Sequence, residues 1–287
     1  MTHLSLLLET RRALLVQLSP TATGFGVSRV DSIDATVDLY RDLLDRGDPK
    51  SMAEFSQTLA QKLRAYSETD IFACLNLIGV KSLTARFNRN LSEEEFAEEC
   101  ALEAKAFLRD PDECAIESLK LAEPPNAPFE NHLLFFAPKR FLTRLQMMLL
   151  PSGKNVALIE LSHVAALSLY QARSNFVALE LGEGYLAISK LTGGTPSVFK
   201  HWTIEAETDI AFFATKELKA LSGATAVSVF GKLANDSVLG FLRDATGLTI
   251  QAATLPAGFN VPSEFQPFLP AILPAIGCAL KGAEVLE

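Results

Sequence analysis

The order of hydrophobic and polar positions predicts short strands and amphipathic helices in alternation. Residues 13–30 form the first clear pattern, an apolar strand, a turn with the letters SPTATG and a second strand. Residues 36–49 place their apolar side chains on one helical face. Residues 51–66 begin with a capping box, Ser51 with Glu54, and carry the apolar stripe of a helix that faces the core.

The middle of the chain continues this alternation. Residues 69–88 predict two strands around a glycine, and residues 91–110 predict a helix whose acidic first turn complements the helix dipole. A strand at residues 115–122 and a turn-rich connection at residues 123–128 follow. Residues 132–171 then contain two strand-then-helix units. This order favours an α/β fold with a largely buried sheet.

The second half of the chain repeats the opening pattern. Residues 176–204 contain three strands, joined by glycine turns at residues 182–184 and 193–194. The elements predicted after them are a helix at 208–221, a strand at 225–230, a helix at 235–245, a strand at 248–253 and a last helix that ends near 282. A hairpin-first α/β unit that occurs twice indicates two related halves that face each other across a cleft.

Composition and charge narrow the class of protein. The chain has 287 residues, is 48% hydrophobic and has a formal net charge of −8. The acidic balance argues against nucleic-acid binding, which normally needs a basic face. None of the four cysteines forms a CxxC pair, so we expect reduced structural thiols.

Apolar runs in the chain are short. The leucine-rich run at residues 4–8 is too short for a secretory signal. Residues 268–280 form the longest apolar run, which Pro270 and Pro274 interrupt, and we expect no run to reach the length that a bilayer requires. Membrane association is therefore expected only through a partner.

The residues suggest no catalytic or metal-binding motif. The four histidines have no metal-ligand spacing, and no G-x-S-x-G sequence is present. The G-x-G at residues 182–184 lies between two strands and does not open a helix, so it is not a dinucleotide fingerprint. Lys139, Arg140 and Arg144 form a small basic face, which we interpret as solvated; contact with anionic lipid or an acidic partner is the alternative.

Four stretches of the chain resemble the PilM-like family of type IV pilus assembly proteins and, more distantly, FtsA. They are the small-domain segment at residues 70–108, the strand-Ala-Pro-Lys-helix sequence LLFFAPKRFLTRLQMML, the hairpin FVALELGEGYLAIS, and the segments SVFGKLANDSVLGFLRDATGLTI and ILPAIGCALKG. The resemblance lies in their order along nearly the whole chain. It implies an actin-like, ribonuclease-H-like duplicated fold with a small inserted α+β domain.

The resemblance also implies a division into domains. Residues 1–67 would form the first part of actin-like domain 1, residues 68–122 the inserted small domain and residues 123–172 the rest of domain 1. Residues 173–287 would form domain 2. The family places a multi-helix subdomain between the positions of Ile204 and Ala226, and this chain has room there for about one helix, so we expect a truncated second-half subdomain.

In the actin-like superfamily, each phosphate hairpin carries glycines and an acidic residue that holds Mg²⁺ through water. In the hairpin at residues 13–30, Gln17 stands where we expect the acid, and Pro20 has no N–H to donate. Phe230 would fill space that a nucleotide needs. We therefore expect a degenerate site and no cofactor, with ATP and Mg²⁺ as the alternative. The residues that would hold ATP are Ser19, Thr21, Thr23, Glu180, Gly182, Gly184, Gly231 and Lys232.

The resemblance implies a scaffold without catalytic activity, cytoplasmic and peripheral to the inner membrane. Its expected partner is the cytoplasmic tail of a PilN-like inner-membrane protein, held in a groove between domain 1 and the small domain. The side chains predicted for that groove are Ile71, Leu75, Leu77 and Phe96. Two alternatives remain open, an ATP-binding switch or ATPase of the same fold and a GspL-like component of type II secretion.

Overall fold

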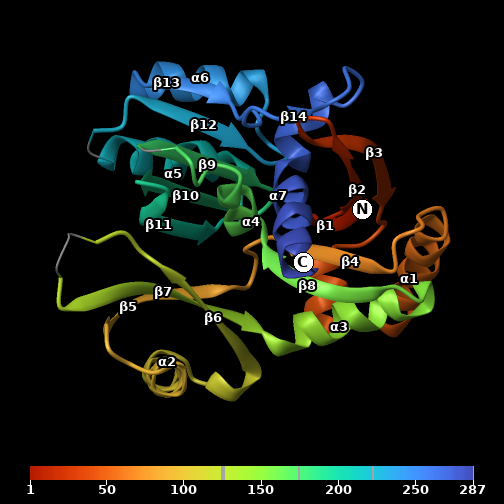
Figure 1. The fold of residues 1–287 in the computed structure, drawn as a ribbon, viewed down its shortest axis with the longest axis horizontal. Coiled ribbons are helices and arrows are strands. Elements are labelled where there is room, and N and C mark those ends of the chain that lie inside the picture. The colour runs from red at the N-terminus through yellow and green to blue at the C-terminus, as the bar shows by residue number, and fades with distance from the viewer. Residues whose placement is uncertain (124–126, 174, 222, 287) are drawn as a thin grey trace.

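The computed structural model describes residues 1–123, 127–173, 175–221 and 223–286. It contains a six-stranded, a five-stranded and a three-stranded sheet. The two larger sheets lie on either side of a long central helix, and the three-stranded sheet lies below them in the view of Figure 1. The α/β class and the duplication predicted from the sequence are confirmed. The connection predicted at residues 123–128 lies partly outside the described residues.

The six-stranded sheet is the core of the first half, in the order β14-β3-β2-β1-β4-β8. Every residue of β1 is buried, because this strand lies between β2 and β4 in the middle of the sheet. The strands are β1 (His3–Leu8), β2 (Arg12–Thr21), β3 (Gly24–Asp34), β4 (Asp70–Leu75), β8 (Asn155–Leu161) and β14 (Phe259–Asn260).

Helices cover both faces of this sheet. The π-helical segment η1 (Leu39–Arg46), α1 (Pro49–Leu63) and α3 (Lys139–Leu149) pack on one face around Leu6 and Leu15. The opposite face, with Leu7 and Leu14, packs against α4 (Ser162–Ser168) and α7 (Leu269–Leu286). Short 3-10 turns occur at η2 (Pro111–Glu113), η3 (Leu150–Ser152) and η4 (Gln266–Phe268).

The five-stranded sheet repeats the connectivity of the first, in the order β11-β10-β9-β12-β13. Its first four positions correspond to β3-β2-β1-β4 of the other half, with two antiparallel hairpins followed by a parallel strand. A single helix, α5, joins β11 to β12, as expected for a truncated subdomain. The elements are β9 (Phe176–Gly182), β10 (Tyr185–Thr192), β11 (Thr195–Thr203), α5 (Glu207–Ala220), β12 (Ala226–Phe230), α6 (Asp236–Thr246) and β13 (Thr249–Ala252).

The inserted small domain differs from the predicted range of residues 68–122. Its sheet is β5-β7-β6, formed by β5 (Lys81–Asn88), β7 (Phe129–Pro138) and β6 (Cys114–Lys120), with α2 (Glu93–Phe107) against it. The capping box of Ser92 and Glu95 is present at the start of α2. The strand β4 belongs instead to the large sheet, where it pairs with β1 and β8. A continuous apolar run such as DIFACL fits any fully buried strand, so the pattern alone did not reveal its sheet.

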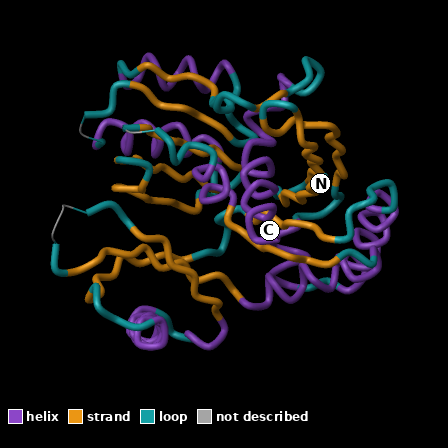
Figure 2. Tube along the Cα trace, in the orientation of Figure 1, coloured by secondary structure: helices purple, strands orange, loops and turns teal. Residues whose placement is uncertain are grey.

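The helix α7 lies between the two halves, together with α4 (Figure 2). By length and composition the segment Gln266–Val285 could cross a membrane, contrary to our expectation from the two prolines, but 61% of it is buried inside the protein. We therefore interpret α7 as a core helix. Its backbone approaches α4 so closely that a β carbon at Gly277 would overlap the carbonyl oxygen of Ala165.

The second half also contacts the small domain directly. The Ala122 N–H donates to the Pro196 carbonyl at 2.7 Å, and the His201 Nε2 lies 3.0 Å from the Ser82 hydroxyl. Burial, with a smaller effect of His163, lowers the pKa of His201 to about 4. The imidazole is therefore neutral in the folded protein at neutral pH.

We predict that Gly277→Ala strongly destabilises the protein. The new methyl group meets the α4 backbone, which cannot move as a flexible side chain would, so the expected loss is at least about 2 kcal/mol of unfolding free energy. Gly240→Ala, within α6, is the matched control, because nothing lies within 4 Å of its β carbon. It should raise stability by up to about 1 kcal/mol. Thermal unfolding followed by circular dichroism measures both, and equal melting temperatures would contradict the prediction.

We predict that stability falls as the pH is lowered from about 6.5 to about 4, in part because of His201. In this window the unfolded chain binds a proton at His201 and the folded chain does not, so acid favours unfolding. Relative to acid conditions, the neutral His201 side chain contributes up to about 3 kcal/mol to the unfolding free energy. This contribution is complete above pH 6.5 and is lost as the pH falls to about 4. His201→Gln should flatten this part of the pH profile in urea unfolding, whereas Ser82→Ala, which keeps the buried imidazole, should retain the slope.

Candidate functional site

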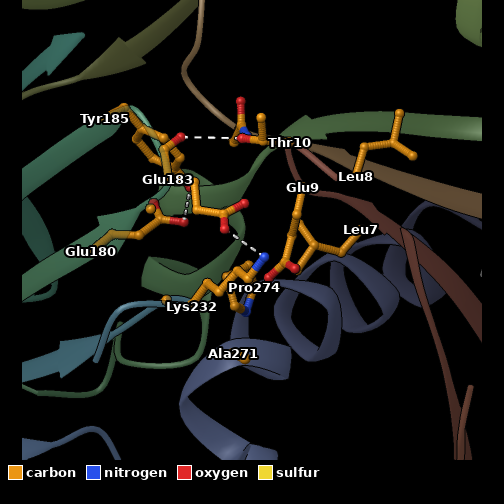
Figure 3. A pocket seen from close by; sticks show the side chains of 13 residues that line it. Leu7, Leu8, Glu9, Thr10, Glu180, Glu183, Tyr185, Lys232, Ala271 and Pro274 are labelled. Atoms are coloured by element: carbon orange, nitrogen blue, oxygen red, sulfur yellow. Dashed lines mark hydrogen bonds and ion pairs between the residues drawn. The ribbon is translucent and has the colours of Figure 1, made fainter. Parts of the chain in front are cut away.

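Two turns, one from each half of the protein, meet in the cleft between the large sheets (Figure 3). The β1–β2 turn carries Glu9 and Thr10, and the β9–β10 turn carries Glu183. The Thr10 hydroxyl donates to the Glu183 backbone carbonyl at 3.3 Å. The cavity between the turns measures about 20 Å³. This volume holds about one water molecule.

An ion pair occupies the mouth of this cavity. Lys232, in the segment between β12 and α6, places its Nζ 2.6 Å from a carboxylate oxygen of Glu183. Glu9 is buried on the opposite side and pairs with Arg12 at 2.7 Å. Burial raises the pKa of Glu9, and the Arg12 guanidinium opposes this effect. The space between the two turns is therefore occupied by charged side chains of the protein itself.

The carboxylate of Glu180 points into an internal network. It accepts a hydrogen bond from the Tyr185 hydroxyl at 2.6 Å, and its other oxygen lies 3.3 Å from the His163 Nδ1. The His163 Nε2 lies 2.9 Å from the Ser189 hydroxyl. All four residues are buried, and burial and the Glu180 charge raise the pKa of Tyr185 well above its usual value. Although serine, histidine and glutamate are aligned, no substrate can reach this buried hydroxyl.

The glycines of the site make room for protein atoms. A β carbon at Gly182 would overlap the Tyr185 ring. At Gly231, φ is +96°, and a β carbon would lie 2.6 Å from the Leu181 carbonyl oxygen. Gly184 has φ of +80°, which the tight β9–β10 turn requires.

The structure brings together only part of the predicted nucleotide site. Glu180, Gly182, Gly231 and Lys232 line the cavity, and Gly184 belongs to the same turn. The prediction for the other three residues was wrong. The register pairs His3 with Leu18 and Leu8 with Ala13, so the β2–β3 turn lies at the opposite end of the sheet from the cavity. The residues that lie at that opposite end are Ser19, Thr21 and Thr23. Gln17 also lies outside the site, where its side chain donates a hydrogen bond to Glu68.

Sequence reasoning missed Glu9, Thr10 and Glu183. The first hairpin of the fold is β1–β2, and its signal was the leucine run at residues 3–8, which we considered only as a possible leader. Glu9 and Thr10 follow β1 as Glu183 follows β9, and the two strands occupy equivalent central positions in their sheets.

The predicted groove residues do not line a groove. Ile71 and Leu75 are buried because they lie on the inner strand β4, and Leu77, which follows this strand, is buried in the core on the other face of the sheet. Phe96 is half-buried and packs on Phe87, with ring centroids 4.9 Å apart, inside the small domain. Ile71, Leu75 and Leu77 are therefore core residues and cannot line a groove.

A hollow between the small domain and the first half lies elsewhere. Its volume is about 160 Å³, and it is bordered by β6, α4, the β10–β11 turn and the end of α7. β6 and β8 are edge strands of their sheets. Partial burial and the nearby Glu160 carboxylate raise the pKa of Glu117 on β6, and Lys281 of α7 forms an ion pair with Glu160 on β8.

The basic face at the start of α3 is engaged within the protein. Arg140 pairs with Asp45 at 2.6 Å, and Arg144 donates to the Leu44 carbonyl at 2.8 Å. Across the described ranges, no three histidine, cysteine or acidic side chains are placed to hold a metal ion.

Comparison with known proteins shows the fold. No family model matches the sequence, and no curated protein is similar to it in sequence. A structure described as the PilM-PilN type IV pilus biogenesis complex matches with a TM-score of 0.80 and 15% identity, over 98% of each chain. The cytoplasmic domain of EpsL, an inner membrane component of the type II secretion system of Vibrio cholerae, matches with a TM-score of 0.56 and 8% identity, over 99% of this chain and 95% of that one.

A protein of unknown function with an actin-like ATPase fold, from Bacteroides thetaiotaomicron, matches with a TM-score of 0.54 and 11% identity, over 97% of this chain and 95% of that one. The expected actin-like fold is thus confirmed. At these identities the likeness concerns the fold alone.

We predict that Tyr185→Phe lowers the unfolding free energy by about 2–3 kcal/mol, because it removes a hydrogen bond to a buried carboxylate. Tyr170→Phe is the matched control. The Tyr170 hydroxyl donates to the neutral Thr254 carbonyl at 2.8 Å, so its loss should cost about 1 kcal/mol. Urea unfolding measures both variants, and equal losses would argue against a charged Glu180.

Proposed function

We propose that this protein is a scaffold in the cytoplasmic part of a type IV pilus or related secretion assembly, and that it binds the tail of a PilN-like inner-membrane protein. The observation that carries the proposal is the match over 98% of both chains to the PilM-PilN structure, with a TM-score of 0.80. The match to the EpsL cytoplasmic domain supports the broader class of inner-membrane assemblies.

The filled cleft supports a role without nucleotide. The Lys232–Glu183 ion pair lies where the two turns meet, and about 20 Å³ of free space remains. Glu180, the acid that would approach a metal ion in this fold, is bound by Tyr185 and His163. A nucleotide would have to break these contacts and widen the cleft in order to bind.

The hollow between the small domain and the first half suits an extended tail. The open edges of β6 and β8 offer unpaired backbone N–H and carbonyl groups to a strand laid between them. Leu119, Val164 and Leu280 provide apolar contacts at the end of this path. We infer that the partner tail lies here, and not against Ile71, Leu75 or Leu77.

We predict that a synthetic peptide of the PilN-like cytoplasmic tail binds the full chain, and that Gln171→Trp weakens binding at least about tenfold. Gln171 is exposed and lines the hollow, so a tryptophan would fill it without disturbing a core. Leu102→Trp is the control, because Leu102 is 56% exposed on α2 and does not line the hollow. Isothermal titration calorimetry measures the affinities.

Three outcomes would contradict the proposal or one of its parts. Equal affinity of the wild-type chain and Gln171→Trp would exclude this hollow as the binding site. Saturable thermal stabilisation by sub-millimolar Mg-ATP would favour the alternative of an ATP-binding switch, because a ligand that binds only the folded state raises the melting temperature. Binding of a type II secretion tail in place of the pilus tail would favour the GspL-like alternative.

A further inference from the structure

The strand β3 exposes a long edge on the side of the protein away from the five-stranded sheet (Figure 1). Among the residues that the structure describes, β14 is its one neighbour on that edge, and it pairs with Phe25 and Gly26. Gly24 and Gly26 admit the β14 backbone, since a β carbon at Gly24 would lie 2.6 Å from the Gly258 carbonyl oxygen. Within the described ranges, no other strand pairs with the edge from Val27 to Asp34.

An apolar hollow accompanies this open edge. Its volume is about 230 Å³, and its apolar lining includes Leu14, Val30 and Phe268. Arg12, Ser32 and Glu264 add polar groups to its wall. The Phe268 side chain is 54% exposed, although it is one of the largest apolar groups of the chain. An open strand edge beside an exposed aromatic residue is typical of a surface that receives another strand.

The charged residues along the β3 edge favour a second copy of this chain as the pairing strand. Arg29 and Asp31 flank Val30 on the same face of β3 and form an ion pair with each other at 2.7 Å. The Arg29 guanidinium also lies over the Tyr66 ring, and the Tyr66 hydroxyl donates to Asp31 at 2.6 Å. Pairing with a second copy would therefore exchange the intramolecular ion pairs of the two copies for two intermolecular ones. If a second copy adds its β3 antiparallel with the twofold axis at Val30, each Arg29 lies opposite the Asp31 of the other copy. An axis at Asp31 would instead place two carboxylates opposite each other, which is unfavourable. The sequence Arg-Val-Asp is therefore complementary to itself in one register.

A bulge in the β2–β3 ladder limits the length of this pairing. The register shifts between Gln17 and Leu18, so that Ser28 is an extra residue. Bulges bend an edge and discourage unspecific pairing, which leaves the regular segment from Arg29 onward for a selective contact.

We propose that β3 is a self-association surface, through which two copies form a continuous antiparallel sheet with a twofold axis at Val30. The Phe268 rings and apolar hollows of the two copies would lie near the axis and exclude water from the new ladder. This surface is on another side of the molecule than the hollow between β6 and β8, so the proposal is independent of the proposed function.

Sedimentation velocity of the full chain over a concentration series tests this proposal. The wild-type chain should form dimers at micromolar concentrations, and 1 M salt should weaken them by screening the Arg29–Asp31 pairs. Arg29→Asp and Asp31→Arg should each weaken association at least about tenfold, because each places like charges opposite each other twice per dimer. The double variant with both reversals should regain association to within about threefold of the wild type.

A second pair of variants keeps the test valid if a charge reversal disturbs the fold. Phe268→Ser should weaken the dimer at least about tenfold, whereas Phe241→Ser, at a residue of α6 that is 50% exposed, should not change it. A wild-type chain that stays monomeric at about 0.5 mM would overturn the proposal and leave the edge to a partner's strand. The proposal would also be overturned if the protein associates and neither charge reversal nor Phe268→Ser weakens the association.

Discussion

The close crossing of α4 and α7 is the constraint on which the rest of this structure depends. At Gly277 the two helix backbones touch, so the distance between them cannot vary with side-chain rearrangement. The start of α7 also accepts a hydrogen bond from Gly231 of the second half at 2.8 Å, and its end packs at Gly282 on Phe72 of the first. Because one helix is in contact with both halves, their relative position is fixed, and with it the contact between Thr10 and Glu183.

Fixed halves explain why charged side chains can fill the cleft without disorder. A carboxylate that loses water needs hydrogen-bond donors at defined places. Glu180 finds one in Tyr185, with the His163 Nδ1 3.3 Å from its other oxygen, and Glu183 finds one in Lys232. Each donor comes from an element that packs against α4 or α7, so the polar network and the helix crossing support each other. The cleft then acts as a part of the core, and a ligand that entered it would compete with intramolecular partners already in place.

The sequence predicted the order of the elements along the chain well, but it did not predict which strands lie side by side in the sheets. Periodicity located the helices and both glycine hairpins of the second half, and the capping box at Ser92 marked the start of α2 correctly. It failed at β1 and β4, whose apolar runs are continuous. An alternating strand reveals which side faces the core, whereas a strand buried on both faces carries no such mark. The first hairpin was therefore placed one strand too late, and Leu75 was assigned to a groove although it lies in the core.

The cleft holds side chains that already contact one another, so under our proposal the partner surfaces are the sheet edges. Barrels remove such edges by closure, but two open sheets and a small inserted sheet leave several. One of them, β6, borders the hollow that Lys281 lines, and Lys281 pairs with Glu160 of the edge strand β8. The edge of β3 lies on another side of the molecule. Backbone groups at an edge bind any strand, so specificity must come from the side chains beside it. The Arg-Val-Asp sequence of β3 and the mixed polar and apolar hollow next to β6 would provide two different selectivities. The two proposed surfaces lie apart, so both could be occupied at once.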